Sequence, residues 1–274
     1  METKKFNYEK NSWSIEKSNK LYGLNKWGRE YFSINSSGNI AVHPKGQNNQ
    51  SLDLFELVEE LQNRNLKLPL LIRFDDILED RVNQLNLAFE KAIKNYKYNG
   101  KYKGVFPIKC NQQRHVVEKL ISCGDKWNFG LEAGSKAELL IALSIVKNPK
   151  SLLICNGYKD QKYIETAILA RKIGLQPIIV IEQVDEIDRI ISASKKLGAA
   201  PLIGIRAKLG SESSGHWGAT SGEKAKFGLS ISNIMIAIDK LKKVNLLKDL
   251  KLLHFHVGSQ INNIAIIKDA IQEA

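Results

Sequence analysis

The chain has 274 residues, of which 43% are hydrophobic, so it can form a packed core and is not a disordered chain. Its net charge is +12, but the lysines are spread along the chain without a basic block interleaved with aromatic residues. We interpret this charge as a lysine-rich solvated surface and keep nucleic-acid binding as a weaker alternative. The three cysteines (Cys110, Cys123, Cys155) lack metal-ligand spacing. No apolar run is long enough to span a membrane, and no signal-type apolar core follows Met1. We therefore expect a cytoplasmic protein without a membrane or nucleic-acid partner.

Residues 1–68 are predicted to form an N-terminal segment with short strands and a helix. Two strand-like runs, residues 31–34 and 40–43, flank the turn-like residues Ser36–Asn39, which predicts a hairpin. Ser51 is expected to cap a helix over residues 52–58.

Residues 69–274 are predicted to form a partial β/α barrel. Leu70–Phe74 reads as a first strand, and Asp75 and Asp76 start a long amphipathic helix. From Gly104 onward, strands and helices alternate, which indicates parallel strands joined by right-handed crossovers. The further predicted strands are 104–109, 128–132, 151–156, 176–182, 201–206 and 251–256. The helices between them are predicted at 113–123, 135–147, 160–173, 184–197 and 230–243.

This pattern fits either an open doubly wound sheet or a (β/α)8 TIM-like barrel. The open sheet predicts a glycine-rich phosphate turn after an early strand, and residues 109–112 contain no glycine. The barrel predicts polar residues at the C-terminal ends of several strands. Such residues do close the apolar runs: Lys109, Glu132, Asn156, Glu182, Arg206 and His256. We therefore predict an α/β protein with a TIM-like barrel, truncated after about seven strands. Because the chain stops in a helical pattern without a stop signal, we expect a fragment of a longer protein.

Lys109 is the candidate nucleophile. We expect it at the mouth of a buried strand, where a desolvated amine is a nucleophile toward carbonyl carbon. The alternative is a lysine that extends from a strand end into solvent.

Three other charged residues lie near strand ends. Glu132 ends a strand, although it is equally explained by attraction to the positive end of the next helix. Glu138 occupies the capping-box position after Ser135, which favours a structural role. Arg206 can bind a carboxylate or lie near a cofactor ring, or form a structural ion pair.

His254 and His256 share one strand face, since side chains alternate along a strand. A metal pair lacks an evident third ligand, and two core histidines are an equally good explanation. Gly258 and Ser259 then form a turn before a helix, where they can donate to a phosphate. The glycine-rich loop Gly210–Gly228, which contains His216 and Trp217, is interpreted as a lid.

These stretches together resemble the biosynthetic arginine decarboxylases, within the barrel-type pyridoxal-phosphate decarboxylases. The motifs are Val-Phe-Pro-Ile-Lys109-Cys-Asn, Leu-Glu132-Ala-Gly-Ser-Lys-Ala-Glu138-Leu, Cys155-Asn-Gly-Tyr-Lys, Gly222-Glu-Lys-Ala-Lys226-Phe-Gly228 and His254-Phe-His256-Val-Gly-Ser259-Gln. The likeness includes the N-terminal Tyr22-Gly-Leu-Asn-Lys-Trp27-Gly and so covers nearly the whole chain.

The resemblance implies decarboxylation of L-arginine to agmatine, a precursor of polyamines such as spermidine. It implies that Lys109 forms a Schiff base with pyridoxal 5'-phosphate, that His256 stacks on the cofactor ring and that Ser259 contacts the phosphate. Glu132, Arg206 and Glu138 match positions near the cofactor. The family also uses magnesium, for which no ligands are assigned.

The resemblance further implies a homo-oligomer, and a glycine-rich phosphate loop and a C-terminal β domain that lie beyond Ala274. We therefore expect the fragment alone to be inactive. The alternatives are a related decarboxylase for ornithine or diaminopimelate, and a non-catalytic pyridoxal-phosphate-binding protein.

Overall fold

The structure, a computed structural model, describes residues 13–46, 50–210, 227–258, 261 and 263–274. The chain divides into two compact units, residues 1–85 and 86–274, which are described separately. The domain boundary between Leu68 and Pro69 stays a prediction. The lid residues His216 and Trp217, and Ser259, lie outside the described residues.

The first unit contains a small antiparallel sheet in the order β1-β2-β3. Its elements are α1 (Ile15–Tyr22), α2 (Leu24–Trp27), β1 (Phe32–Ile34), β2 (Ile40–Val42), β3 (Leu52–Asp53) and α3 (Leu54–Asn63). The predicted hairpin is confirmed, because Phe32 pairs with Val42. Asn35 Oδ1 accepts hydrogen bonds from the backbone N–H groups of Ser37 and Asn39, at 3.0 and 2.9 Å, and so holds the turn.

Two predictions for residues 51–74 are wrong, one in the N-terminal segment and one at the start of the predicted barrel. Asp53, not Ser51, caps α3, because its Oδ1 accepts from the N–H groups of Phe55 and Glu56. The run Leu70–Phe74 is not a strand. A strand needs a neighbouring strand for its backbone hydrogen bonds, and no described strand pairs with this run. The described parallel sheet therefore has six strands rather than seven.

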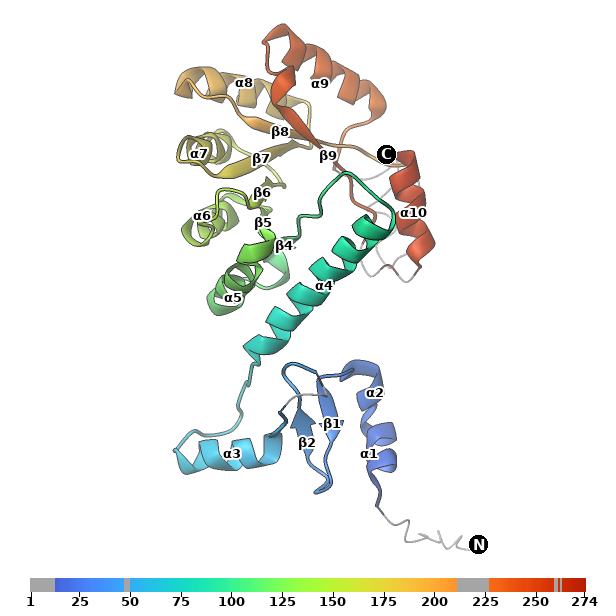
Figure 1. Ribbon diagram of the computed structural model, residues 1–274. Helices are drawn as coiled ribbons and strands as arrows, with labels where there is room; N and C mark the ends of the chain where they lie inside the picture. The colour runs from blue at the N-terminus through green and yellow to red at the C-terminus, as the bar shows by residue number, and fades with distance from the viewer. Residues whose placement is uncertain (1–12, 47–49, 211–226, 259–260, 262) are drawn as a thin grey trace, which may run out of the picture. The chain divides into compact units, whose positions relative to one another are not determined.

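The second unit is built on a parallel sheet in the order β4-β5-β6-β7-β8-β9. The strands are β4 (Val105–Pro107), β5 (Gly130–Ala133), β6 (Leu152–Cys155), β7 (Gln176–Ile181), β8 (Leu202–Arg206) and β9 (Leu250–His254). The helices are α5 (Arg114–Gly124), α6 (Lys136–Ile145), α7 (Gln161–Lys172), α8 (Asp185–Leu197), α9 (Ile231–Lys243) and α10 (Ile264–Glu273). Short 3-10 turns are η1 (Ile108–Cys110), η2 (Asp125–Trp127) and η4 (Leu247–Asp249). Helices α5 to α9 follow one another along one side of the curved sheet, as expected for consecutive units of a β/α barrel (Figure 1).

The long predicted helix is present as α4 (Asp75–Asn95), which begins at the predicted aspartates and crosses the boundary between the two units. Its predicted apolar face is only partly buried. Val82 is buried, whereas Phe89 is 43% and Tyr96 is 85% exposed. The Phe89 ring stacks on Tyr102, with centroids 3.8 Å apart. The amphipathic spacing therefore predicted the helix correctly, but it did not predict how much of the apolar face of α4 is buried.

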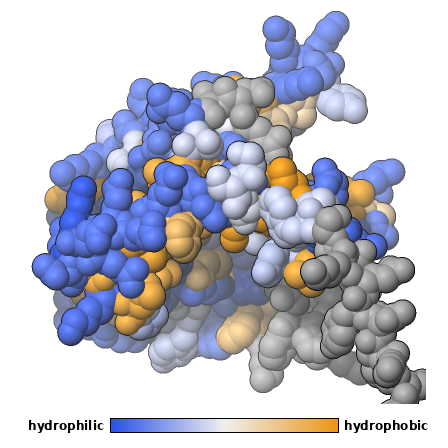
Figure 2. All heavy atoms as spheres, turned by 90° about the horizontal axis from the view of Figure 1, so that it is seen from below, coloured by the Kyte–Doolittle hydropathy of each residue, from blue (hydrophilic) through white to orange (hydrophobic). Residues whose placement is uncertain are grey.

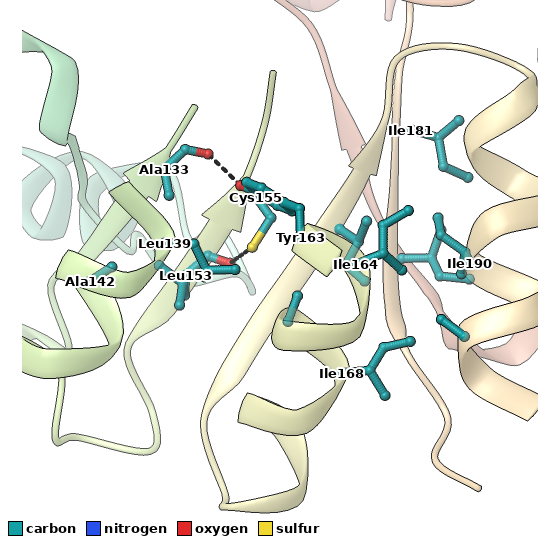
Figure 3. Close-up of a cluster of buried hydrophobic side chains, with 14 of the residues drawn as sticks. Ala133, Leu139, Ala142, Leu153, Cys155, Tyr163, Ile164, Ile168, Ile181 and Ile190 are labelled. Atoms are coloured by element: carbon teal, nitrogen blue, oxygen red, sulfur yellow. Dashed lines mark hydrogen bonds between the residues drawn. The ribbon is translucent and has the colours of Figure 1, made fainter. Parts of the chain in front are cut away.

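The main hydrophobic core lies between the sheet and helices α5 to α9, and it includes Leu131, Leu153, Ile164 and Ile181. Figure 3 shows how Tyr163 of α7 reaches into this core toward the end of β5. Its hydroxyl donates to the Ala133 carbonyl oxygen at 2.8 Å. Burial raises the pKa of Tyr163, which keeps the hydroxyl protonated as the donor. The buried Tyr163 hydroxyl thus fixes the backbone at Ala133, the last residue of β5.

On the face shown in Figure 2, hydrophilic residues predominate, and apolar residues lie between them in separate areas. Several surface lysines form exposed ion pairs, such as Lys136 with Asp160 at 2.9 Å and Lys240 with Asp188 at 2.8 Å. Such pairs contribute about 1 kcal/mol or less each. The absence of a nucleic-acid partner stays a prediction.

Candidate functional site

The candidate site lies at the edge of the sheet where the parallel strands end. Glu132 is the penultimate residue of β5, Asn156 follows β6 and Glu182 follows β7. Arg206 and His254 are the last residues of β8 and β9, and they pair in the sheet register. Because parallel strands share one C-terminal edge, polar residues far apart in sequence come together there.

Lys109 is placed differently from the prediction. β4 ends at Pro107, and Lys109 lies in the 3-10 turn η1, which the Asn111 N–H closes by donating to the Ile108 carbonyl at 3.1 Å. Pro107 lacks an N–H, which favours the end of the ladder at this point. The Lys109 side chain is 64% exposed, so the expected desolvated strand end is wrong. Its Nζ lies 3.8 Å from Glu132 Oε1, so the amine is accessible and faces a carboxylate.

Glu132 is the buried carboxylate of the site, with a side chain only 9% exposed. Its Oε1 accepts a hydrogen bond from Asn156 Nδ2 at 3.3 Å, while Oε2 has no partner among the described residues. Burial raises the pKa of Glu132, and the Lys109 ammonium opposes that rise. Oε1 of the carboxylate is therefore held in place by Asn156, and Oε2 is available to accept a hydrogen bond from a bound molecule.

Arg206 and Glu182 form the second charged pair, with Nη1 3.3 Å from Oε1 and side chains 15% and 3% exposed. Glu182 Oε1 also accepts from the Gly157 backbone N–H at 3.0 Å. The guanidinium lies over the Phe227 ring, 5.8 Å from its centroid. Arg206 is thus held by two groups, the Glu182 carboxylate and the Phe227 ring, with its head group at the strand ends.

The two histidines differ in their surroundings. β9 ends at His254, so His256 lies beyond the strand, and the prediction that both occupy one strand face is wrong. The pairing of β9 with β8 ends at Arg206 and His254, and Gly258 then adopts a φ of 109° in the turn. His256 is exposed, whereas His254 is half-buried. Burial and the nearby Arg206 lower the pKa of His254 to about 4.

Glu138 has the structural role that its position predicted. Ser135 caps α6 by accepting from the Glu138 N–H, and Glu138 Oε2 accepts from the Gly134 N–H at 2.6 Å. Its Oε1 accepts from Gln112 Nε2 at 3.0 Å. Glu138 thereby links Gln112, in the segment after Lys109, to Gly134, the residue after β5. These two segments carry Lys109 and Glu132.

Sequence reasoning missed a buried ion pair behind the site. Lys159 Nζ lies 3.0 Å from Glu186 Oε1, and the two side chains are 0% and 1% exposed. Lys159 also donates to the Gly157 carbonyl oxygen, and Glu186 Oε2 accepts from the Glu182 N–H at 2.8 Å. The pair therefore fixes the backbone on both sides of the Gly157–Glu182 hydrogen bond. Lys159 ends the motif Cys155-Asn-Gly-Tyr-Lys, but nothing in the local sequence indicates that its side chain is buried or that Glu186 is its partner.

Within the described ranges, no group of three or more histidine, cysteine, aspartate or glutamate residues is arranged to hold a metal ion. None of the helices in the described part of the chain has the length and apolar character needed to span a membrane.

A sheet of consecutive β/α units with polar groups at its C-terminal edge defines a barrel-type enzyme scaffold. The family model for the pyridoxal binding domain of pyridoxal-dependent decarboxylases matches residues 81–274, and the chain belongs to this family.

Curated relatives are similar along nearly the whole chain. The biosynthetic arginine decarboxylase of Parasynechococcus marenigrum (strain WH8102) is 66% identical over 262 residues, which are 96% of this chain and 41% of that protein. The enzyme of the same name from Prochlorococcus marinus (strain MIT 9313) is 63% identical over 263 residues, with the same coverage. The chain thus spans about two fifths of the length of these relatives.

Solved structures show the same fold. The crystal structure of the biosynthetic arginine decarboxylase from Campylobacter jejuni has a TM-score of 0.81 and 33% identity, covering 92% of this chain and 40% of that one. A diaminopimelate decarboxylase from M. jannaschii has a TM-score of 0.65 at 23% identity, covering 88% of this chain and 50% of that one. The second likeness concerns the fold alone.

Proposed function

We propose that this chain is the pyridoxal-phosphate-binding part of an arginine decarboxylase, which releases carbon dioxide from L-arginine and forms agmatine for polyamine synthesis. The observation that carries the proposal is the exposed Lys109 amine, 3.8 Å from the buried Glu132 carboxylate at the C-terminal edge of the sheet. The substrate is proposed from the names of the relatives, which are 66% and 63% identical. These names favour arginine over ornithine and diaminopimelate.

The residues at this edge fit pyridoxal phosphate. The Lys109 amine is accessible to an aldehyde, and three buried polar atoms have no partner among the described residues: Glu132 Oε2, Asn156 Oδ1 and His254 Nδ1. Buried polar atoms are stabilised by hydrogen bonds, so these atoms can bind polar groups of a cofactor. Lys109 would hold the cofactor covalently, and Glu132, Arg206, His256 and Ser259 would surround it. When bound, pyridoxal phosphate supplies an electron sink for the carbanion left by loss of carbon dioxide.

Within this proposal, each residue has a physical task. Lys109 supplies the nucleophilic amine, and Glu132 holds that amine by charge attraction. Arg206 presents a cation whose position is set by Glu182 and Phe227. His256 is exposed, so its imidazole face is available to stack on an aromatic ring.

The proposal includes features carried only by the resemblance. These are magnesium dependence, a homo-oligomer, a cytoplasmic location and a barrel that begins at residue 69. We also propose that residues 1–274 alone do not turn over arginine. Carbon dioxide release from labelled arginine by this chain tests that statement, and sustained turnover would contradict it.

The test of the site is covalent trapping. The chain is mixed with pyridoxal phosphate and reduced with borohydride, and the modified peptide is identified by mass spectrometry. We expect the label on Lys109, and we expect Lys109→Arg to lose it because a guanidinium keeps the charge but forms no imine under these conditions. Lys147 is an exposed lysine on another part of the surface, and Lys147→Arg is the matched control. Labelling that is spread evenly over surface lysines would sink the assignment.

A further inference from the structure

His254 is a half-buried titratable residue, and the proposed function gives its Nε2 no role. It ends β9, opposite Arg206 of β8, and lies among charged and titratable groups from several elements. These groups are Arg206, Glu182, His256 and Lys109. A histidine enclosed in this way is either a packing residue or part of the arrangement of the site.

A chain of polar contacts runs from His254 to the Lys109 amine. His254 Nε2 is 3.4 Å from Asn156 Nδ2, and the same Nδ2 donates to Glu132 Oε1 at 3.3 Å. Glu132 Oε1 is in turn 3.8 Å from Lys109 Nζ. The chain crosses from β9 through the residue after β6 to β5 and η1. It therefore connects β9, at one edge of the described sheet, with the turn η1 that follows β4 at the other edge.

The donors and acceptors in this chain allow one consistent arrangement. Asn156 Nδ2 has two N–H groups, so it can donate to Glu132 and to His254 at once. The second bond requires an unprotonated Nε2, which places the proton of a neutral imidazole on Nδ1. A reversed Asn156 amide would instead direct Oδ1 at the Glu132 carboxylate, which is repulsive. Burial beside Arg206, which lowers the pKa of His254 to about 4, favours the neutral ring that this arrangement needs.

We propose that His254 is a positioning residue, which acts through Asn156 to keep the Glu132 carboxylate directed at the Lys109 amine. The proposal deepens the proposed function, on which it rests for the importance of Lys109. His254 is not required to contact the cofactor or the substrate. Its neutral Nε2 fixes one N–H of Asn156, and the other N–H then fixes Oε1 of Glu132.

The experiment measures Lys109 reactivity without any cofactor. The folded chain is treated briefly with acetic anhydride, and the rate of acetylation at Lys109 is divided by the rate at the exposed Lys147. While Glu132 Oε1 lies 3.8 Å from Lys109 Nζ, the carboxylate restrains the amine and blocks part of the reagent's approach to it. We expect His254→Leu to raise the ratio about threefold, the size of effect that corresponds to one neutral hydrogen bond. We expect His254→Gln to stay near the wild-type ratio, because the glutamine carbonyl can accept from Asn156.

Two further arms separate positioning from packing. Asn156→Leu is expected to raise the ratio as His254→Leu does, and the double variant to raise it no further, because both residues act through one contact. His115→Gln, on the exposed start of α5, is the matched control and is expected to leave the ratio unchanged. A folded His254→Leu with the wild-type ratio would overturn the proposal.

One measurement needs no variant, so it stands if His254→Leu does not fold. The ¹⁵N shifts of the wild-type imidazole are expected to show the proton on Nδ1 and an unprotonated Nε2. A proton on Nε2 at neutral pH would refute the arrangement. Neither the acetylation ratio nor the ¹⁵N shifts require pyridoxal phosphate. If borohydride trapping shows no cofactor on Lys109, the proposed function is rejected, but the test of His254 still stands.

Discussion

Protonation of His254 makes the stability of this protein depend on pH. His254 has a folded-state pKa of about 4, below its ordinary value of 6.5. Between these two values the unfolded chain binds more protons than the folded one, so the free energy of unfolding falls as the pH falls. The stabilising contribution is fully present above pH 6.5 and is lost by about pH 4. The difference corresponds to about 3 kcal/mol for this one group.

We therefore predict that His254→Gln flattens the pH dependence of stability in that window. Glutamine does not titrate, so the variant loses less free energy of unfolding than the wild type between pH 6.5 and 4. Urea unfolding at several pH values measures it. His115→Gln, at an exposed position, serves as the control and should follow the wild type. Parallel profiles for His254→Gln and the wild type would contradict the prediction.

The buried pair Lys159–Glu186 leads to a second prediction at the residue scale. Lys159→Met leaves Glu186 as an uncompensated buried carboxylate, and we expect it to lower the free energy of unfolding by about 3–5 kcal/mol. Lys162→Met is the matched control. Lys162 is 74% exposed and lies 3.5 Å from Glu165, so its loss should cost less than about 1 kcal/mol. Equal costs in urea unfolding would show that the buried pair has no special role.

At the scale of elements, the turn after β6 is fixed by a close backbone approach. Gly157 has a φ of +76°, and a Cβ at this position would lie 2.1 Å from the Gly134 carbonyl oxygen. Relief of this clash requires the strand ends to move apart, and the Gly157 N–H bond to Glu182 is lost with that movement. The conformation and the contact both require glycine here.

We predict that Gly157→Ala lowers the free energy of unfolding by at least about 3 kcal/mol. The control is Gly198→Ala at the end of α8, where φ is +57° and no atom lies within 4 Å of the added Cβ. That change should cost only about 1–2 kcal/mol of backbone strain. Thermal unfolding of both variants measures the difference, and similar losses would show that the close approach can relax.

The sequence predicted the elements better than their surroundings. Buried parallel strands such as β7 are continuous apolar runs, so their order and type follow from local pattern. Leu70–Phe74 carries the same kind of pattern but pairs with no described strand. A local apolar pattern does not indicate whether a neighbouring strand is available for pairing. The exposure of Lys109 and the burial of Lys159 depend on side chains from other strands. The site residues were therefore predicted by type and strand-end position, while the contacts among Asn156, Glu132 and His254 were not.

At the scale of the whole molecule, the described parallel sheet has two edges, β4 and β9. An edge strand presents unpaired backbone groups and favours association with another chain. On β9, Leu253 is 49% exposed and lies between Leu252 and His254. Charged residues on an edge strand oppose such pairing, because a second strand would have to bury them.

We predict that residues 1–274 self-associate with rising concentration and that Leu253→Lys weakens this association. Sedimentation velocity over a concentration series measures it. Leu140→Lys is the matched control, since Leu140 is 56% exposed but lies on α6, away from the sheet edge. If association is driven by the edge strand, only Leu253→Lys reduces it. If both substitutions reduce it equally, general surface hydrophobicity is the cause, and the edge has no part in it.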